Sequence, residues 1–372
     1  MGAADADLVV VGGGPAGLAT AICARLSGLD ALVLEAARPP VEKACGEGLM
    51  PDGAAVLRSL GVDLGAVESR PFRGVRYLDG EAVAEGRFPG EPGLGIRRTV
   101  LHDALRRRAE AVGVRVRWGS RVRGWTGDGF ATDEGTVRGR WLIAADGRTS
   151  RIRGWAGLEG RAPRRRRFGV RRHYRVAPWT DLVEVHWADG CEAYVTPVGE
   201  RLVGVALLWS DGRGTFDGLL ARFPRLEERL AGCEISSRDR GAGPLEQRCR
   251  RVVRERLALV GDAAGYLDPI TGEGLALAFR QAEAVVRAIA AGELEGYVAA
   301  HRQIVRHPLA VIRLLLFVER WPRLRRRVTA ALAADPDLMS RFLALKMRAG
   351  GPRLMGGDGL LRLTAETVLG GL

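Results

Sequence analysis

Lysine is almost absent from this chain of 372 residues, in which Lys43 and Lys346 are the only lysines among 57 basic residues. Arginine supplies the rest and sets the formal net charge of +13. Nucleic-acid-binding surfaces gather basic residues in patches that are interleaved with aromatic side chains, whereas the arginine run at residues 164–167 contains no aromatic residue. We therefore expect that run to lie on a solvated loop, and we expect no nucleic-acid partner.

Cysteine and long apolar runs are also scarce. The five cysteines show no C-x-x-C spacing, which speaks against zinc-binding and disulfide-rich proteins and indicates a reducing compartment. We therefore expect no metal site. A membrane-spanning helix needs roughly 18 consecutive apolar residues, but the longest candidate, at residues 309–318, is interrupted by Arg313. Because no secretory signal is visible at the N-terminus either, we expect a cytoplasmic protein.

A glycine-rich turn near the N-terminus carries the first chemical signal. A β-branched strand at residues 7–11 runs into Gly12, Gly14 and Gly17, and an alanine-rich helix follows to about residue 27. In this G-x-G-x-x-G spacing the first glycine permits a tight turn, the second lets the backbone approach a pyrophosphate, and the third lets the helix pack closely on the strand. The helix N-terminus then offers free N–H groups to the phosphates.

The next strand supports a dinucleotide site. Residues 31–34 form an apolar strand that ends on Glu35, which lies 18 residues after Gly17 and is placed to accept hydrogen bonds from a ribose diol. We also expect Ala16, inside the turn, to contact the cofactor. Strand, turn, helix, second strand and acid follow one another in the order that a dinucleotide-binding unit requires.

Two later segments repeat the pattern of an apolar strand that runs into a glycine-bearing turn. These strands are expected at residues 141–145 and 257–260, and a long helix follows the second turn. Open α/β sheets bind ligands at the carboxyl ends of their strands. The residues of the two turns that we expect to bind the cofactor are Asp146, Gly147, Gly261, Asp262, Gly272 and Gly274.

These three ordered motifs resemble those of the superfamily of flavoprotein aromatic hydroxylases and geranylgeranyl reductases, whose members bind FAD. The resemblance covers roughly residues 5–300. It implies an α/β fold in which a Rossmann-like FAD-binding domain is interleaved with an antiparallel-sheet substrate domain and is followed by C-terminal helices. Alternating apolar residues in the middle of the chain favour the antiparallel sheet independently. The expected boundaries are 1–70, 96–160 and 251–296 for the FAD-binding domain, 71–95 and 161–250 for the substrate domain, and 297–372 for the C-terminal helices.

The resemblance also implies roles for single residues. Asp262 would hold the ribityl and pyrophosphate region of FAD, and the helix that starts near Gly274 would point its N-terminus at the flavin. Asp146 and Gly147 would line the cofactor path. Arg98 matches a helix start that contacts FAD in this superfamily, and an exposed, capped helix end is the alternative for this arginine.

The stretch KACGEGLMP at residues 43–51 resembles, more narrowly, a cysteine-containing loop of the geranylgeranyl-reductase-like branch. By this resemblance Cys45 lies near the flavin ring and is the candidate catalytic residue, whereas a buried packing cysteine is the alternative. The branch also has an aromatic strand beside the flavin. This chain departs from that pattern, because Val195 and Thr196 stand where a second aromatic residue is usual.

Histidine and aromatic side chains of the central strands are candidates for the wall of a substrate pocket, although each is more readily explained by packing. The two that we expect to contact substrate are His173 and Tyr194. The further candidates are Tyr174, His186 and Trp187.

The tail alternates apolar residues and arginines at helical spacing, with helix breaks expected at Pro308 and Pro322. Such helices could pack on the FAD-binding domain, wall a long apolar pocket with the arginines reaching outward, or lie on a membrane surface. Peripheral membrane contact through these basic helices is therefore one expectation.

A flavin can deliver hydride to an activated alkene or support hydroxylation with dioxygen, and the protein supplies position and electrostatics. The sequence favours an FAD-dependent monooxygenase that is driven by NADPH or NADH and hydroxylates a hydrophobic aromatic or polyketide-type secondary metabolite. The alternative enzyme is a reductase of prenyl or other activated C=C bonds. The alternative of another class is a flavin-binding redox partner without its own substrate.

Overall fold

The first sheet is built around an apolar strand with neighbours on both edges. The computed structural model describes residues 4–162, 166–210 and 212–346, and in it β1 (Ala6–Val11) pairs in parallel with β2 (Ala31–Glu35) and β11 (Gly135–Ala144). Nearly all of β1 and all of β2 are buried, as expected for a parallel sheet that is covered on both faces. The other strands of this sheet are β8 (Arg115–Trp118), β9 (Val122–Trp125), β10 (Gly129–Thr132), β18 (Val253–Arg254) and β19 (Leu257–Leu259).

Three long helices accompany this sheet. Helix α1 (Pro15–Leu26) contacts both α3 (Arg98–Ala111) and α7 (Gly274–Ala290). It begins directly after β1, because Gly14 is extended and Pro15 has its φ angle fixed for the first helical turn. The shorter helices of this half are α2 (Pro51–Ser59), α4 (Arg151–Trp155) and the 3-10 turn η1 (Gly261–Ala264).

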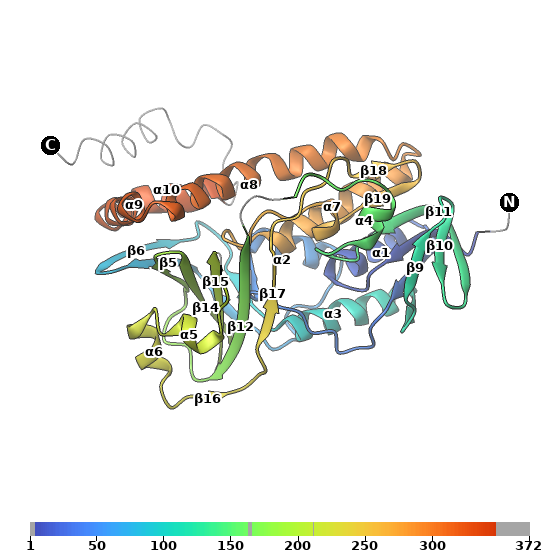
Figure 1. Cartoon of the computed structure of the whole chain (residues 1–372). Helices are drawn as coiled ribbons and strands as arrows, with labels where there is room; N and C mark the ends of the chain where they lie inside the picture. The colour runs from blue at the N-terminus through green and yellow to red at the C-terminus, as the bar shows by residue number, and fades with distance from the viewer. Residues whose placement is uncertain (1–3, 163–165, 211, 347–372) are drawn as a thin grey trace.

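The second sheet lies in the other half of the molecule (Figure 1). Its strands are β5 (Gly74–Asp79), β6 (Ala82–Arg87), β12 (Arg167–Arg175), β13 (Val183–Ala188), β14 (Cys191–Gly199), β15 (Leu202–Ser210), β16 (Glu234–Ile235) and β17 (Arg240–Ala242). The strand pairs are antiparallel, as the alternating pattern predicts, except that β5 and β13 run parallel because the chain passes through the first half between them. Two short helices, α5 (Phe216–Leu220) and α6 (Pro224–Leu230), share an apolar core with β12, β14 and β15.

A small sheet of three strands contacts the second sheet through β14. It consists of β3 (Gly48–Leu49), β4 (Arg70–Phe72) and β7 (Gly93–Gly95). The contact is close at Gly95, where an added Cβ would lie 1.6 Å from the carbonyl oxygen of Pro197. The expected domain limits near residues 70 and 96 fall at this small sheet.

As far as residue 346, where the described part ends, the tail forms the helices α8 (Gly296–Arg320), α9 (Pro322–Ala334) and α10 (Pro336–Lys346). Helix α8 packs on α7, whereas α9 and α10 pack on β6, so α8 runs along the top of Figure 1 from one half to the other. The break expected at Pro322 is confirmed, but the break expected at Pro308 is wrong, because α8 continues through it. Pro308, Val311 and Leu315 are buried, and this packing outweighs the roughly 3 kcal/mol that an interior proline costs.

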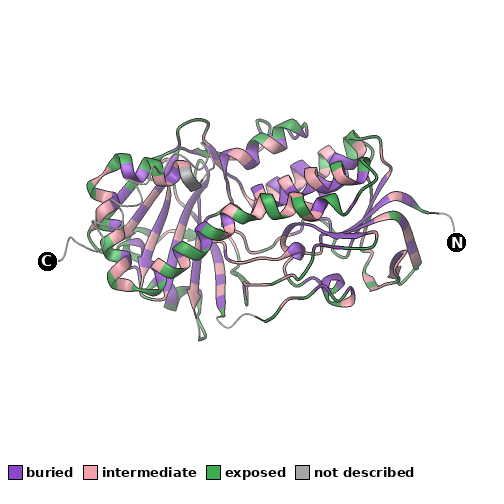
Figure 2. Cartoon of the chain, turned by 90° about the horizontal axis from the view of Figure 1, so that it is seen from above, coloured by how far each residue is buried: buried purple, intermediate pink, exposed green. Residues whose placement is uncertain are grey.

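The buried residues form separate apolar cores in the two halves, and α8 joins them. Figure 2 shows exposed residues along the long helix that crosses the molecule. Among the residues that the structure describes, no helix combines the length and apolarity needed to cross a membrane.

Candidate active site

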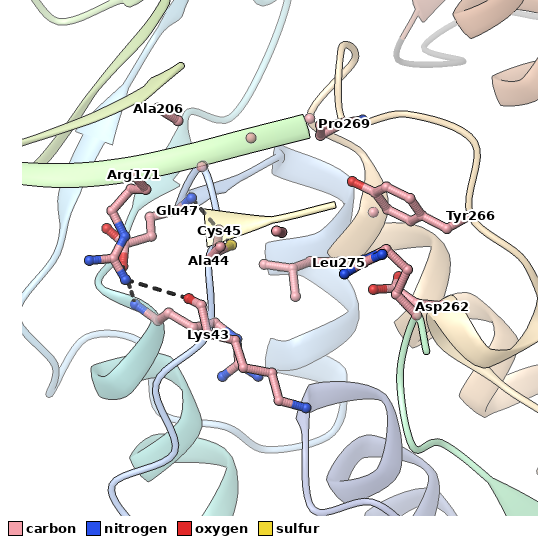
Figure 3. Close-up of a pocket in the computed structure, with 18 of the residues that line it drawn as sticks. Lys43, Ala44, Cys45, Glu47, Arg171, Ala206, Asp262, Tyr266, Pro269 and Leu275 are labelled. Carbon is pink, nitrogen blue, oxygen red and sulfur yellow. Dashed lines mark hydrogen bonds and ion pairs between the residues drawn. The ribbon is translucent and has the colours of Figure 1, made fainter. Parts of the chain in front are cut away.

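A cavity of about 580 Å³ is lined by residues of both halves. Its lining includes the start of α1, the loop at residues 42–48, the turns that follow β11 and β19, and inward-facing residues of the second sheet. Figure 3 shows the loop with Lys43, Cys45 and Glu47 on one side of this cavity and Asp262 and Tyr266 on the other. The structure therefore brings together the segments that the sequence motifs singled out.

A buried arginine faces the N-terminus of α1. Arg98 is 5% exposed, so the alternative of an exposed helix end is wrong for this residue. Its Nη1 atom has no hydrogen-bond partner among the residues that the structure describes, and its Nη2 atom would lie 3.8 Å from a Cβ added to Gly14. A buried guanidinium without a partner beside free helix N–H groups is suited to an anion such as a pyrophosphate.

The glycines of the first turn serve close packing. Gly12 has a φ of +108°, and a Cβ added there would lie 2.3 Å from the carbonyl oxygen of Ala145. A Cβ added to Gly17 would lie 1.8 Å from the carbonyl oxygen of Gly12, so any larger residue would separate helix from strand. Gly14 and Ala16 line the cavity, whereas Gly12 and Gly17 shape the turn behind it.

Two side chains fix the same turn from outside. Glu35 accepts hydrogen bonds from the backbone N–H groups of Gly13, at 2.6 Å, and Ala37, at 2.8 Å. His102 of α3 is buried, and its Nε2 atom lies 2.9 Å from the Gly13 carbonyl oxygen. The sequence did not reveal the role of His102, because a single histidine in a helix carries no motif; the contact of Glu35 with a ribose stays a prediction.

The turns after β11 and β19 present two carboxyl groups at the cavity. Burial raises the pKa of Asp146 and of Asp262, and Lys43 and Arg148 counteract the rise for Asp262. Asp262 is thus a half-buried carboxyl group at the cavity that lies near the cationic side chains of Lys43 and Arg148. The other expected cofactor residues of these turns also line the cavity: Gly147, Gly261, Gly272 and Gly274.

Cys45 lies half-buried in the cavity wall, and its position beside the flavin ring stays a prediction. Its Sγ atom accepts a hydrogen bond from the backbone N–H of Glu47 at 3.4 Å. Burial, followed by the negative charge of Glu47, raises the pKa of the Cys45 thiol, while the positive charge of Arg98 lowers it. The net effect is a raised pKa, so the Cys45 thiol keeps its proton at neutral pH.

Glu47 ties the Cys45 loop to both halves of the protein. Its φ of +59° is unusual for a residue with a side chain, and its buried carboxylate accepts a hydrogen bond from the backbone N–H of Arg98 at 2.9 Å. The other carboxylate oxygen contacts Nε2 of His173. Because Arg171 can only donate, its contact at 2.9 Å with Nδ1 of His173 makes that nitrogen an acceptor. His173 is therefore neutral and donates from Nε2 to Glu47, consistent with the lowering of its pKa by burial.

His173 lies behind the cavity wall and does not line the cavity. Three other candidates for the substrate wall also lie outside it: Tyr174 belongs to an apolar core, Trp187 stacks on Tyr77, and His186 contacts Glu184. Among the described residues, the cavity lining includes no histidine. Tyr194 does line the cavity, so its contact with substrate remains a prediction.

Apolar side chains form the cavity wall on the side of the second sheet. They come from the residue that precedes α2, from β4, from the neighbouring strands β5 and β13, and from the loop before α7. They are Met50, Phe72, Val75, Val183, Val185 and Ile270. This wall can hold an apolar substrate next to the thiol of Cys45.

One member of the arginine run is buried, which contradicts the expectation that residues 164–167 lie on a solvated loop. Arg167 is 5% exposed, and its guanidinium lies 2.9 Å from Glu192, 2.9 Å from Asp268 and 3.4 Å from Glu319. Tyr194 donates a hydrogen bond to Glu192 at 2.7 Å, which connects this group to the cavity. We call Arg167 and these three acids, Glu192, Asp268 and Glu319, the acid cluster. Residues 164 and 165 lie outside the described part of the chain.

Comparison with known proteins decides the family. The sequence model of a protein family described as FAD binding domain matches residues 5–203 of the chain. The chain belongs to this family. A menaquinone reductase from Mycobacterium tuberculosis is 30% identical over 310 residues, which cover 73% of this chain and 73% of the relative. Digeranylgeranylglycerophospholipid reductase 1 from Methanothermobacter thermautotrophicus is 26% identical over 331 residues, which cover 80% of each protein.

The fold of this flavoprotein is also found among solved structures. A flavoprotein/dehydrogenase from Cytophaga hutchinsonii superposes with a TM-score of 0.81 at 19% identity and covers 98% of this chain and 99% of its own. The protein is thus an FAD-dependent oxidoreductase with a Rossmann-like fold, and the unpartnered Arg98 beside α1 fits the pyrophosphate of FAD.

Proposed function

We propose that this flavoprotein is a reductase that adds hydrogen across a C=C bond in the isoprenoid chain of a lipid or quinone, with NADPH or NADH as the source of electrons. The observation that carries the proposal is the position of the Cys45 thiol, which keeps its proton in a cavity whose substrate side is apolar. The names of the relatives, a menaquinone reductase and a digeranylgeranylglycerophospholipid reductase, support the substrate class.

The residues around the cavity have separate roles in this reaction. Bound FAD, once reduced, would supply the hydride. Arg98 and the N–H groups of α1 would hold the pyrophosphate, and the apolar cavity wall would keep the isoprenoid chain away from water. Cys45 donates a proton from Sγ to one carbon of the double bond while the other carbon receives the hydride, so that the bond gains both hydrogens. The thiolate that results faces Arg98 and Arg171, which favour its charge, and water returns the proton.

Three assays separate this proposal from hydroxylation and from a redox partner without substrate. NAD(P)H oxidation that depends on an added prenyl lipid or menaquinone excludes the redox partner. Under anaerobic conditions a reductase raises the mass of its product by about two daltons per reduced bond, whereas a hydroxylase stops. With labelled dioxygen only a hydroxylase incorporates the label. Incorporation into a phenolic or polyketide substrate would refute the proposal.

Cys45→Ser tests the proton donor. A serine hydroxyl is a far weaker acid than a thiol, so we expect turnover to fall roughly 10²-fold, the low end for general acid catalysis, while FAD stays bound. Cys233→Ser is the matched control, because Cys233 does not line the cavity. In heavy water, moreover, the wild-type product should carry one deuterium per reduced bond at the carbon that Cys45 protonates. Unchanged turnover in Cys45→Ser would remove Cys45 from the reaction.

A further inference from the structure

Three of the most exposed large apolar side chains of the described chain lie together at the end of α8. Leu314 is 50% exposed, Phe317 57% and Trp321 53%. Their spacing of three and four residues puts them on one side of the helix. We call this row of three residues the apolar row.

A row of arginines runs beside the apolar row on the same face of α8. All four are exposed, and their spacings of four, seven and seven residues keep them within a narrow sector of the helix. They are Arg302, Arg306, Arg313 and Arg320. The single acid of α8 and α9 is Glu319, which is buried, so these two helices present no carboxylate to solvent.

The opposite face of the same helix belongs to an apolar core that also includes part of the cavity wall. Val311, Ile312 and Leu315 belong to one apolar core with Met50 and Phe72, which line the cavity. The segment of α8 that carries the apolar row outside therefore shares an apolar core with two residues of the cavity wall. A bilayer on the outer face would lie across this core from the cavity.

We propose that the apolar row and the arginine row of α8 dock this protein on the surface of an anionic lipid bilayer. Arginines near such a surface contribute about 1 kcal/mol each, and tryptophan and phenylalanine side chains partition into the headgroup region. Charge argues against a second copy of this chain as the occupant, because a symmetric contact would place the two arginine rows together without acids to neutralise them.

Flotation with lipid vesicles tests the proposal on the full-length protein loaded with FAD. The wild type should bind vesicles that contain phosphatidylglycerol and should bind vesicles of phosphatidylcholine alone much more weakly. A variant with the four arginines changed to glutamine should lose about 600-fold in affinity, at about fivefold for each arginine. The same four positions changed to lysine retain their charge and should retain binding.

A second variant tests the apolar row: Leu314→Gln, Phe317→Gln and Trp321→Gln together should lower the affinity at least tenfold. The matched control changes Leu26 and Ile235 to glutamine, because these side chains are equally exposed, at 50% and 54%, on other elements. Retained FAD and an unchanged circular-dichroism spectrum show that each variant is folded. Vesicle binding needs no turnover, so its failure is distinguishable from failure of the proposed reaction.

Several results would overturn the docking proposal. One is a folded wild-type protein that does not bind anionic vesicles. Another is an apolar-row variant whose affinity for these vesicles equals that of the wild type. A dimer in light scattering that the apolar-row variant abolishes would assign the face to a second copy. Vesicle binding that begins only when residues 347–372 are removed would show that this segment occupies the face in the full-length chain. Tight binding of duplex RNA or DNA in place of vesicles would show that the face binds a nucleic acid.

Discussion

Asp268→Asn should change how the stability of this protein depends on pH. In the acid cluster three carboxyl groups surround the single guanidinium of Arg167, and all four side chains are buried. Burial is the largest cause that raises the pKa of Asp268, and Glu192 and Glu319 add to the rise while Arg167 opposes it; the resulting pKa is about 7. The cluster therefore keeps a proton in the folded protein at pH values at which the unfolded chain has released it.

The sign follows from the number of protons that each state binds. An unfolded aspartate titrates near pH 4, so between about pH 4 and pH 7 the folded state binds up to one proton more than the unfolded state. The free energy of unfolding then falls as the pH rises, by at most about 1.4 kcal/mol per pH unit. Over the whole window the loss is at most about 4 kcal/mol. Above pH 7 to 8 Asp268 is ionised in both states, and its contribution to the slope ends.

Urea unfolding between pH 5 and pH 8, followed by tryptophan fluorescence with FAD present, measures this slope. Asp268→Asn removes the proton and one negative charge, so the slope of the variant between pH 5 and pH 7 should be smaller than that of the wild type. Glu200→Gln is the control, because Glu200 is exposed in the turn between β14 and β15 and should leave the slope unchanged. Equal slopes for wild type and Asp268→Asn would refute the reasoning.

Three further variants test the cofactor site and the scaffold. Arg98→Met should weaken FAD binding about 10- to 100-fold in a fluorescence titration, because a charged hydrogen bond contributes about 1.5–3 kcal/mol; unchanged affinity would show that this guanidinium does not contact FAD. Arg325→Met should lower the free energy of unfolding by about 3–5 kcal/mol, because it leaves Asp79, whose Oδ2 atom lies 2.7 Å from Nε of Arg325, buried without its partner; adding Asp79→Leu should restore much of that loss, and no recovery would contradict the argument. Gly17→Ala should lower the melting temperature and release FAD, because the new methyl group meets a backbone oxygen at 1.8 Å, whereas Gly296→Ala, with nothing within 4 Å, should change stability by less than about 0.5 kcal/mol.

The cofactor half could be predicted from the sequence because its signals are local. The turn with Gly12 and Gly17 dictates its own geometry, and Glu35 follows at a fixed distance along one strand-helix-strand unit. The placement of Cys45 beside the cavity came from family resemblance, since a single cysteine gives no local signal of its neighbours.

The parts that sequence analysis missed depend on contacts between distant segments. An arginine run has the same composition whether it is solvated or, like Arg167, surrounded by acids from other strands and helices. The alternating pattern of its strand made His173 a candidate for the cavity wall. Only the fold shows that Glu47 occupies the space between His173 and the cavity. The continuity of α8 through Pro308 likewise depends on tertiary packing, which local propensity does not contain.

The loop at residues 42–48 limits how this protein can be recombined with its relatives. By chain position it belongs to the cofactor half, yet its carbonyls and carboxylates accept hydrogen bonds from the second sheet: Thr196 donates to Gly46 at 2.9 Å and Arg171 to Glu42 at 3.1 Å. A chimera that exchanged only residues 161–250 would leave these acceptors facing foreign side chains. An exchange meant to change the substrate should therefore replace the second sheet together with the loop at residues 42–48. The boundary between the two halves is formed here by hydrogen bonds and does not coincide with a linker in the chain.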